Sequence, residues 1–366
     1  MHLKISRATL LNQIQRCQNI VDKRTTNPLL TNILFEAYQQ NLKLTATDLQ
    51  STFSSSKVAE IIEEGSLAVD SKKIFEIVRE LNPEVPLELV SHKKFLELHS
   101  GNVKFKLAIQ SADEFPSEPV DETDLFIDIQ ASELIRMISS TSFAMSNDET
   151  RKYLTGSLFE VSQEFGFRIV TTDGHRMALS EMHLDQQDSE TNCIVPKKAV
   201  LEIKRLAESA EDKITLYLGK QQVRIEIDNQ KFISKVIDAK YPVYEEVIPK
   251  YNQYEAIIDK NQLDQALRRS LIVANVFTHD VKLTFTSGKL AIAANNSEQE
   301  QAKEDLAIDY HGSEIEVGFN AKYMRDVLGA IQSSTIRIKL KDSLSPALLL
   351  EADHEHSRHV LMPMRI

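Results

Sequence analysis

The stretch TTDGHRMA, residues Thr171–Ala178, places an acid, a histidine and an arginine within four residues, beside a glycine. Aspartate and histidine can exchange protons near neutral pH and arginine can hold an anion, so such a trio could serve an active site. The same residue types also form ordinary turns. A third interpretation is a binding site without catalysis. The elements that position the trio must decide among the three.

Nothing else in the sequence favours an enzyme. No serine or cysteine nucleophile with a suitable base accompanies Asp173, His175 and Arg176, and there is neither an HExxH zinc motif nor a phosphate-cradling glycine loop. Cys17 and Cys193 lie far apart, fit no metal-ligand spacing and are typical of reduced thiols. The sequence therefore predicts no cofactor and no bound metal.

Charge and hydropathy limit the class of protein. The 366 residues suffice for two or three domains, and 43 basic against 54 acidic residues give a net charge of −11. Global attraction to nucleic acid is not expected, although a local basic face could still bind it. The N-terminal MHLKISRATLL has no apolar signal core, and no run approaches the ~18 apolar residues that cross a bilayer. We expect a soluble, cytoplasmic protein without a membrane partner.

A threefold internal repeat organises the chain. Similar helix starts lie at Ile5, Ile129 and Ile258, a second set at Val69, Val195 and Phe319, and similar hairpin patterns at Ile33, Ser157 and Val281. A fourth, strand-like set recurs in the first two repeats. Because these elements share one order and a near-constant spacing, the sequence predicts three similar α+β domains, 1–123, 124–252 and 253–366. Linkers are expected near Glu122–Asp124 and Lys250–Gln253.

Polar residues at the helix starts are expected to cap them. Ser6, Asp70, Asp259 and Asn320 are good N-caps, whereas Gln130 and Pro196 stand at the other two starts. Lysine follows closely in the second helix of each repeat, at Lys72, Lys198 and Lys322. A cation at the positive end of a helix costs roughly 0.3–1 kcal/mol, so an external anion such as phosphate would explain it. The alternative is a solvated face of mixed charge.

The repeat also bears on the opening stretch. Asp48, Asp173 and Asn295 fall in the same slot at the end of a strand, which favours a turn role for Asp173 and weakens the catalytic interpretation. Only the middle repeat has His175 and Arg176 there. A binding site unique to that repeat and a plain turn both remain open.

Eight segments resemble one family in order and spacing: TATDL, RKYLTGSLFE, TTDGHRMAL, CIVPKKAV, DAKYPVYEEVIPK, AANNSEQEQAKE, GFNAKYMRDVL and VLMPMRI. They are similar to the beta subunits of bacterial DNA polymerase III, the sliding clamps. The resemblance implies a DNA-clamp fold, a ring-shaped homodimer with helices lining the central hole and sheets outside, and no enzyme activity. The ring would encircle double-stranded DNA and tether the polymerase and other replication and repair proteins, giving processivity.

The resemblance also implies partners and a groove for their peptides. The expected partners are the DNA polymerase III alpha subunit, the clamp-loader delta subunit, other DNA polymerases, and mismatch-repair and ligase proteins with clamp-binding motifs. The groove would comprise Leu154, Thr172, Gly174, His175, Arg176, Met177, Pro242, Val247, Asn320, Tyr323, Val360, Met362, Pro363, Met364 and Arg365. His175, Arg176 and Arg365 would bond the peptide at the rim. Two residues depart from familiar members of the family. Those members have two tyrosines where this chain has Lys152-Tyr153, and an arginine where it has Glu246.

Two further surfaces are hypothesised. DNA phosphates would contact Arg24, Lys72, Lys198 and Arg205, with Lys152 and Tyr153 as secondary contacts. Lys322 is not included because Asn320 and Tyr323 beside it match groove positions. The ring would close head to tail, an edge strand with Lys104, Phe105, Lys106 and Leu107 meeting a helix with Leu271 and Ile272, and Glu298, Glu300 and Glu304 facing the lysines. The rival functions are an enzyme using Asp173, His175 and Arg176, and a repeat scaffold that does not bind nucleic acid.

Overall fold

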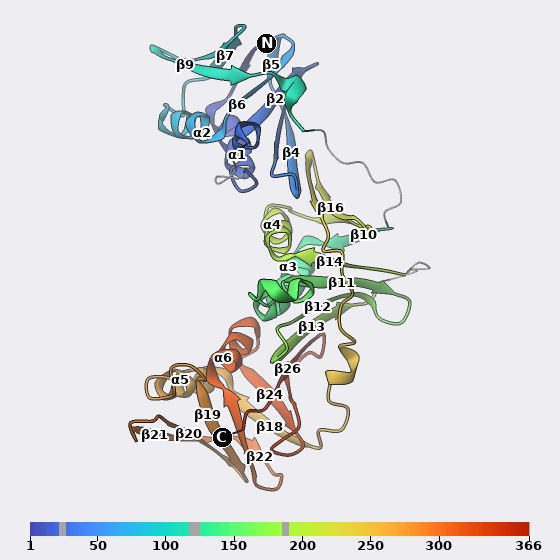
Figure 1. Ribbon diagram of the computed structural model, residues 1–366, viewed down its shortest axis with the longest axis vertical. Helices are drawn as coiled ribbons and strands as arrows, with labels where there is room; N and C mark the ends of the chain where they lie inside the picture. The colour runs from blue at the N-terminus through green and yellow to red at the C-terminus, as the bar shows by residue number, and fades with distance from the viewer. Residues whose placement is uncertain (22–26, 117–124, 185–189, 366) are drawn as a thin grey trace. The chain divides into compact units, whose positions relative to one another are not determined.

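The computed structural model describes residues 1–21, 27–116, 125–184 and 190–365. They form two compact units, Met1–Ala131 with Leu201–Val236, and Ser132–Val200 with Ile237–Ile366 (Figure 1). Arg24 and the expected linker Glu122–Asp124 lie outside the described residues. The domain boundaries at 123/124 and 252/253 stay predictions.

The elements follow the order that the repeat predicts: a strand, a helix, further strands, a second helix and more strands. The first repeat comprises β1 (His2–Ile5), α1 (Arg7–Cys17), β2 (Asn32–Tyr38), β3 (Asn41–Thr47), β4 (Ser51–Val58), β5 (Glu60–Glu63), β6 (Gly65–Asp70), α2 (Ser71–Glu80), β7 (Leu87–Ser91), β8 (Phe95–Ser100) and β9 (Val103–Gln110). The second comprises β10 (Leu125–Gln130), α3 (Ala131–Thr141), β11 (Gly156–Ser162), β12 (Gly166–Thr172), β13 (Arg176–Met182), β14 (Thr191–Pro196), α4 (Lys197–Ala207), β15 (Lys213–Leu218), β16 (Gln222–Ile227) and β17 (Gln230–Lys235).

The third repeat has the same order. It comprises β18 (Tyr254–Asp259), α5 (Lys260–Ser270), β19 (Asp280–Thr286), β20 (Lys289–Asn295), β21 (Gln301–Ala307), β22 (Asp309–Tyr310), β23 (Ile315–Asn320), α6 (Ala321–Ala330), β24 (Thr335–Leu340), β25 (Ala347–Glu351) and β26 (Ser357–Leu361). Short 3-10 turns include η3 (Ser142–Ala144), η4 (Glu149–Leu154) and η5 (Glu245–Val247). Three similar domains of helices and sheets are therefore confirmed.

The four predicted helix caps are confirmed. The side chains of Ser6 and Asp70 accept the backbone N–H groups of Thr9 and Lys73, at 3.1 and 2.8 Å. Those of Asp259 and Asn320 accept from Gln262 and Tyr323, at 2.8 and 3.1 Å. Each cap satisfies a donor that the first helical turn leaves without a partner, which fixes where the helix begins.

The predicted hairpins are also present. β2 turns into β3, β11 into β12 and β19 into β20, and the strand pairs among the described residues are antiparallel. In the first unit, β17 pairs with β4 and so joins strands of the first two repeats in one thirteen-stranded sheet. Phe232 and Phe53 lie opposite each other in that pairing, and both are fully buried.

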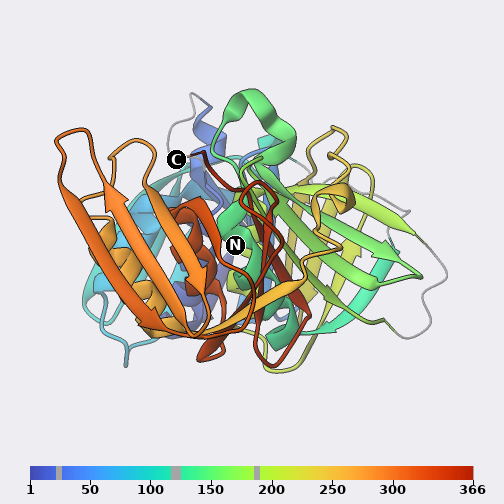
Figure 2. The same cartoon turned by 90° about the horizontal axis from the view of Figure 1, so that it is seen from below.

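The second unit contains a nine-stranded and a four-stranded sheet. β13 of the second repeat pairs with β26 of the third, with Met177 opposite Val360, so the two repeats share the larger sheet. The four-stranded sheet, β21-β20-β19-β23, packs one face against α5 and α6; its strands are orange in Figure 2. Leu283, Ile292, Leu267 and Met324 belong to the core between them.

One predicted alignment is wrong by a residue. Asp48 and Asp173 follow their strands and accept backbone N–H groups in the turn, from Gln50 and Ser51 and from His175 and Arg176. In the third repeat β20 includes Asn295, and the next residue, Asn296, accepts from Glu298 and Glu300. Asn296 is therefore the equivalent turn residue. The sequence could not decide between Asn295 and Asn296, because either of the two consecutive asparagines in AANN could make the turn.

The strand predicted as an edge has one long partner. β9 pairs with β8 along Val103–Ala108, and only Ile109 and Gln110 pair with β6. Leu271 and Ile272 do not lie on a helix as expected, because α5 ends at Ser270. Leu271 packs partly against the core of the second unit, whereas Ile272 is 82% exposed. Cys17 and Cys193 are both buried. Among the described residues, no helix is long and apolar enough to cross a membrane.

Candidate functional site

The opening stretch forms the tight turn between β12 and β13. The Asp173 carboxylate accepts the backbone N–H groups of His175 and Arg176, at 2.9 and 3.1 Å, and the Gly174 N–H donates to the Thr172 hydroxyl at 3.1 Å. Gly174 has a φ of +90°, which a side chain would strain. Asp173 and Gly174 thus have structural roles, because each stabilises the conformation of the turn.

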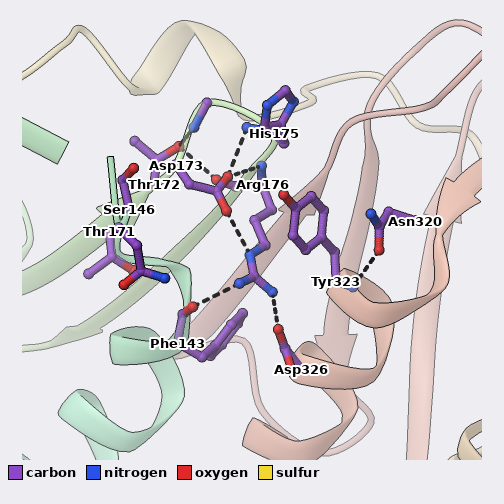
Figure 3. Close-up of polar contacts among 12 residues, drawn as sticks. Phe143, Ser146, Thr171, Thr172, Asp173, His175, Arg176, Asn320, Tyr323 and Asp326 are labelled. Atoms are coloured by element: carbon purple, nitrogen blue, oxygen red, sulfur yellow. Dashed lines mark hydrogen bonds and ion pairs between the residues drawn. The ribbon is translucent and has the colours of Figure 1, made fainter. Parts of the chain in front are cut away.

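Arg176 is buried rather than reaching the rim as expected. Its side chain is 8% exposed; Nε lies 3.1 Å from the Asp173 carboxylate, and Nη2 donates to the Phe143 carbonyl at 2.9 Å. Nη1 lies 2.5 Å from the Asp326 carboxylate on α6 (Figure 3). The guanidinium also lies over the Tyr323 ring, 4.3 Å from its centre. Arg176 therefore ties the second repeat to the third, and a peptide could not use these donors without breaking the ties.

The residue type at the position of Arg176 differs among the repeats. The residues whose backbone N–H donates to the turn aspartate or asparagine, just before the pairing with the next strand begins, are Ser51, Arg176 and Glu300, the third turn being one residue longer. Ser51 donates its hydroxyl to Ser234 at 3.2 Å, across the β4–β17 pairing. The arginine tie is accordingly a property of the junction between the second and third repeats alone.

His175 and Tyr323 form the rim of this site. His175 is exposed, and its ring stacks on that of Tyr323 with centres 6.2 Å apart. Burial raises the pKa of Tyr323, and the Asp173 carboxylate adds to the effect, so its hydroxyl stays protonated. Asn320, expected at the groove, caps α6 and donates to the Thr278 carbonyl at 3.0 Å. Its polar atoms are thus already used.

The C-terminal segment runs along the same site. The Met362 N–H donates to the His175 carbonyl at 3.0 Å, and the Met364 N–H donates to the Gly318 carbonyl at 2.8 Å. These two bonds fix Met362 to Met364 between the β12–β13 turn and β23. β26, just before, pairs with β13 of the second repeat as well as with β25 of the third. The strand therefore does more than pack within its own repeat.

Apolar residues make the floor and one wall. Met177 and Val360 are buried in a cluster that includes Leu158, Tyr241 and Leu348, and Leu154 is also buried. Near cluster residues in the chain, Val247 and Met362 are 39% and 37% exposed, and Pro242 is exposed. Val243, which was not predicted, is 60% exposed. Glu246 is exposed on η5 beside Val247. The site thus offers apolar side chains to a ligand beside a polar rim.

The predicted DNA contacts among the described residues lie on three elements: Lys72 on α2, Lys152 and Tyr153 on η4, and Lys198 and Arg205 on α4. Lys72 is exposed on α2 and Arg205 on α4 in the first unit, whereas Lys152 and Lys198 are exposed in the second. Lys72 lies 3.9 Å from Glu76, and Arg205 donates to the buried Glu202. Tyr153 packs against the Met177–Val360 cluster, so it belongs with the apolar site more than with an exposed basic face.

The predicted interface charges have partners within the chain. Lys104 lies 2.8 Å from Glu97, and Lys106 lies over the Phe95 ring, 4.2 Å from its centre. Glu304 on β21 pairs with Arg269 on α5, at 2.5 Å. Glu298 and Glu300 are exposed. Phe105 is 38% exposed and Leu107 is buried.

Sequence reasoning missed two residues of the site and one exposed aromatic residue of a nearby loop. Asp326 and Phe143 bind Arg176, and Phe277 is 89% exposed in the loop before β19. Asn320 and Ala321 bond the backbone of that loop at Thr278 and His279. Phe277 in NVFTHD has only polar or small neighbours downstream, which was a usable signal for an exposed aromatic; Asp326 in a mixed-charge helix gave none.

Three family models match the chain. The N-terminal, central and C-terminal domains of the DNA polymerase III beta subunit match residues 1–119, 128–243 and 245–365. The beta sliding clamp of Pseudomonas putida is 36% identical over 368 residues, and that of Haemophilus influenzae is 32% identical over 369. Both comparisons cover 100% of each chain.

Solved structures agree. The DNA polymerase III subunit beta from Pseudomonas aeruginosa superposes with a TM-score of 0.96 at 36% identity, and the Caulobacter crescentus protein with 0.94 at 34%, each covering 100% of both chains. The clamp from Pseudomonas aeruginosa bound to griselimycin gives 0.97 at 36% identity.

Proteins of this kind are non-enzymatic processivity factors for DNA polymerase, which confirms that the Asp173, His175 and Arg176 trio is not an active site. Full-length identity above 30%, three consecutive domain matches and a common fold lead to one assignment. The chain belongs to the DNA polymerase III beta-subunit family, the sliding clamps.

Proposed function

We propose that this sliding clamp holds its partners by a peptide groove at the junction of the second and third repeats. The observation that carries the proposal is the exposed apolar set Val247, Met362 and Pro242. Pro242 follows Tyr241 of the buried Met177–Val360 cluster, Val247 precedes Ile248, which packs against that cluster, and the Met362 N–H donates to the carbonyl of His175 at the rim. One or two apolar anchors of a short linear motif would fill it, and such anchors contribute ~2 kcal/mol or more each. Methionines adapt to different side chains, which suits several partners.

Each residue of the groove has a distinct role in this proposal. Met362 and Val247 contact the anchors, and His175 bonds the peptide backbone at the rim. Arg176 and Asn320 act as scaffold, because their polar atoms already hold the turn, α6 and the loop before β19. Arg365 is exposed and can meet charged residues of the ligand.

The ligands are the clamp-binding segments of replication and repair proteins. The polymerase alpha subunit, the delta subunit of the clamp loader, other DNA polymerases, and mismatch-repair and ligase proteins would each use this groove in turn. The protein would work in the cytoplasm, where the bacterial chromosome lies.

The ring closes head to tail in the proposed assembly. β9 is an edge along Val103–Ala108 and β21 is the edge of the four-stranded sheet, so pairing between subunits would satisfy both rows of backbone groups. Six similar domains in a twofold dimer then surround duplex DNA. Lys72, Lys198 and Lys152 would contact phosphates without reading bases, which permits sliding.

An array of overlapping fifteen-residue peptides from the alpha subunit of the same bacterium tests the groove. The tightest peptide is then measured by fluorescence anisotropy against the intact clamp and against the double variant Met362→Ala, His175→Ala. We expect the variant to lose most of its affinity, while it stays dimeric and persists on nicked circular DNA until the DNA is cut. Val58→Ala, which truncates an exposed apolar residue of the first unit, is the matched control. Affinity unchanged in the double variant would overturn the groove assignment.

A further inference from the structure

A cavity of about 580 Å³ lies on the four-stranded sheet, on the face turned away from the helical core. Its floor crosses the strands in one row, because Lys282 pairs with Ala293 and Ala293 with Lys303. Their neighbours Leu283 and Ile292 are fully buried on the opposite face. The small side chain of Ala293 between two lysines leaves the hollow.

Some charged side chains that line the cavity have partners among the described residues, and others do not. Glu316 lies 3.1 Å from the Lys282 amine, and Asp280 accepts the Thr278 hydroxyl. Lys303 and Arg365 are exposed and have no ion pair within the described part of the chain. The lining has three cations, Lys282, Lys303 and Arg365, against two carboxylates, Asp280 and Glu316, so its formal charge is slightly positive on a protein whose net charge is −11.

The C-terminal segment leads from the proposed groove to the cavity. Met364 and Arg365 line it, and Met362 two residues earlier lies in the groove. An extended chain advances ~3.3 Å per residue, so about two residues of ligand span the step from one to the other.

We propose that this cavity binds an acidic segment that flanks the apolar anchors of a partner's motif, with Lys303 and Arg365 as its cations. The inference rests on the proposed groove, since the anchors set the position of the flank. It adds a specificity determinant: partners with acidic flanks would bind more tightly than partners with the same anchors and basic flanks.

The test uses the tightest peptide of the array, extended at either end by three aspartates, three asparagines or three lysines. For one of the two ends we expect affinities in the order aspartate, asparagine, lysine, with roughly three- to tenfold between the extremes because exposed ion pairs are individually weak. The difference should shrink as salt is raised, since screening shortens to about 3 Å at 1 M.

Lys303→Glu should flatten or reverse this order while the affinity of the unextended peptide is unchanged. Lys220→Glu, the same change at an exposed lysine of the first unit, should leave the order intact. Because Lys303 is next to Glu304, analytical ultracentrifugation must show that the variant assembles like the parent. The proposal is overturned if neither end shows a charge preference, or if Lys303→Glu leaves the preference unaltered. A lost flank effect with intact sensitivity to Met362→Ala contradicts this inference alone and leaves the groove standing.

Discussion

Nη1 of Arg176 lies 2.5 Å from Oδ2 of Asp326, and this contact joins the β12–β13 turn of the second repeat to α6 of the third. Arg176 is 8% exposed, whereas Asp326 is 48% exposed. The arginine charge is thus removed from water and depends on Asp173, Asp326 and the Phe143 carbonyl. Removing the arginine should cost more than removing Asp326, because Asp173 still pairs with the arginine when Asp326 is absent.

We expect Arg176→Ala to lower the free energy of unfolding by about 3 kcal/mol, since it leaves Asp173 without its partner and opens space beside the Tyr323 ring. Asp326→Ala should cost at most about 1 kcal/mol, because half of its side chain is solvated. Urea unfolding followed by circular dichroism measures both, with the exposed Asp309→Ala as control. Equal losses for Arg176→Ala and Asp326→Ala would contradict this account.

His359 predicts a dependence of stability on pH. It is fully buried in β26, neither ring nitrogen has a hydrogen-bond partner in the described residues, and burial lowers its pKa from 6.5 to about 4. As pH falls from 6.5 towards 4 the unfolded chain takes up the proton first, so the free energy of unfolding contributed by this site decreases in that window. Well above pH 6.5 the His359 ring is neutral in both the folded and the unfolded chain, so this site no longer makes the free energy of unfolding depend on pH.

His359→Leu should remove this slope and stabilise the protein by about 2 kcal/mol more at pH 5 than at pH 7, because leucine takes up no proton when the chain unfolds. Urea midpoints at pH 7, 6 and 5 give the slope. His311→Leu, at a histidine that is 85% exposed, should keep the parental slope. Parallel pH profiles for the parent and His359→Leu would count against a buried neutral imidazole.

The proposed ring predicts that the dimer weakens when the apolar side chains just after α5 are truncated. Leu271→Ala with Ile272→Ala should shift the dimer to monomers in analytical ultracentrifugation, because Ile272 is 82% exposed and would be covered only in the assembly. Leu344→Ala, which truncates a residue that is 76% exposed elsewhere in the second unit, should leave the dimer intact. A persistent dimer in the double variant rules this surface out.

The phosphate contacts predict a change in salt dependence. Neutralising Lys198 should reduce the slope of log K against log salt by about 0.9 if it displaces one counterion from duplex DNA. Lys220→Ala, outside the predicted set, serves as the control. Linear and nicked circular duplexes measured across salt concentrations also separate retention by topology from binding strength. An unchanged slope for Lys198→Ala removes Lys198 from the DNA-binding set.

Patterns within a few residues predicted local structure well. Ser6, Asp70, Asp259 and Asn320 cap their helices because an N-cap needs only a side-chain acceptor three residues before its donor. The hairpins followed from alternation and turn residues for the same reason. Where two registers fit equally, as for Asn295 and Asn296, local pattern could not choose.

The burial and the bonding partners of the site's side chains could not be predicted from the sequence, because they depend on residues distant in the chain. The sequence identified Arg176 but not its burial, because Phe143 comes from η3 and Asp326 from α6, both distant from Arg176 in the sequence. Ile272 looked helical because the apolar spacing continues for one turn beyond the end of α5 at Ser270. The positions of residues in elements were therefore predictable, whereas their partners required the tertiary structure.

Ser51, Arg176 and Glu300 occupy equivalent positions in the three copies of this turn, and only the middle copy has an arginine there that binds the next repeat. If the proposed function holds, each chain therefore has a single binding site for its partners. A loader, a polymerase and a repair enzyme must take turns there, and their order of occupancy follows from concentration and dissociation rate. A dimer with two such sites could hold one partner at work while a second waits for exchange.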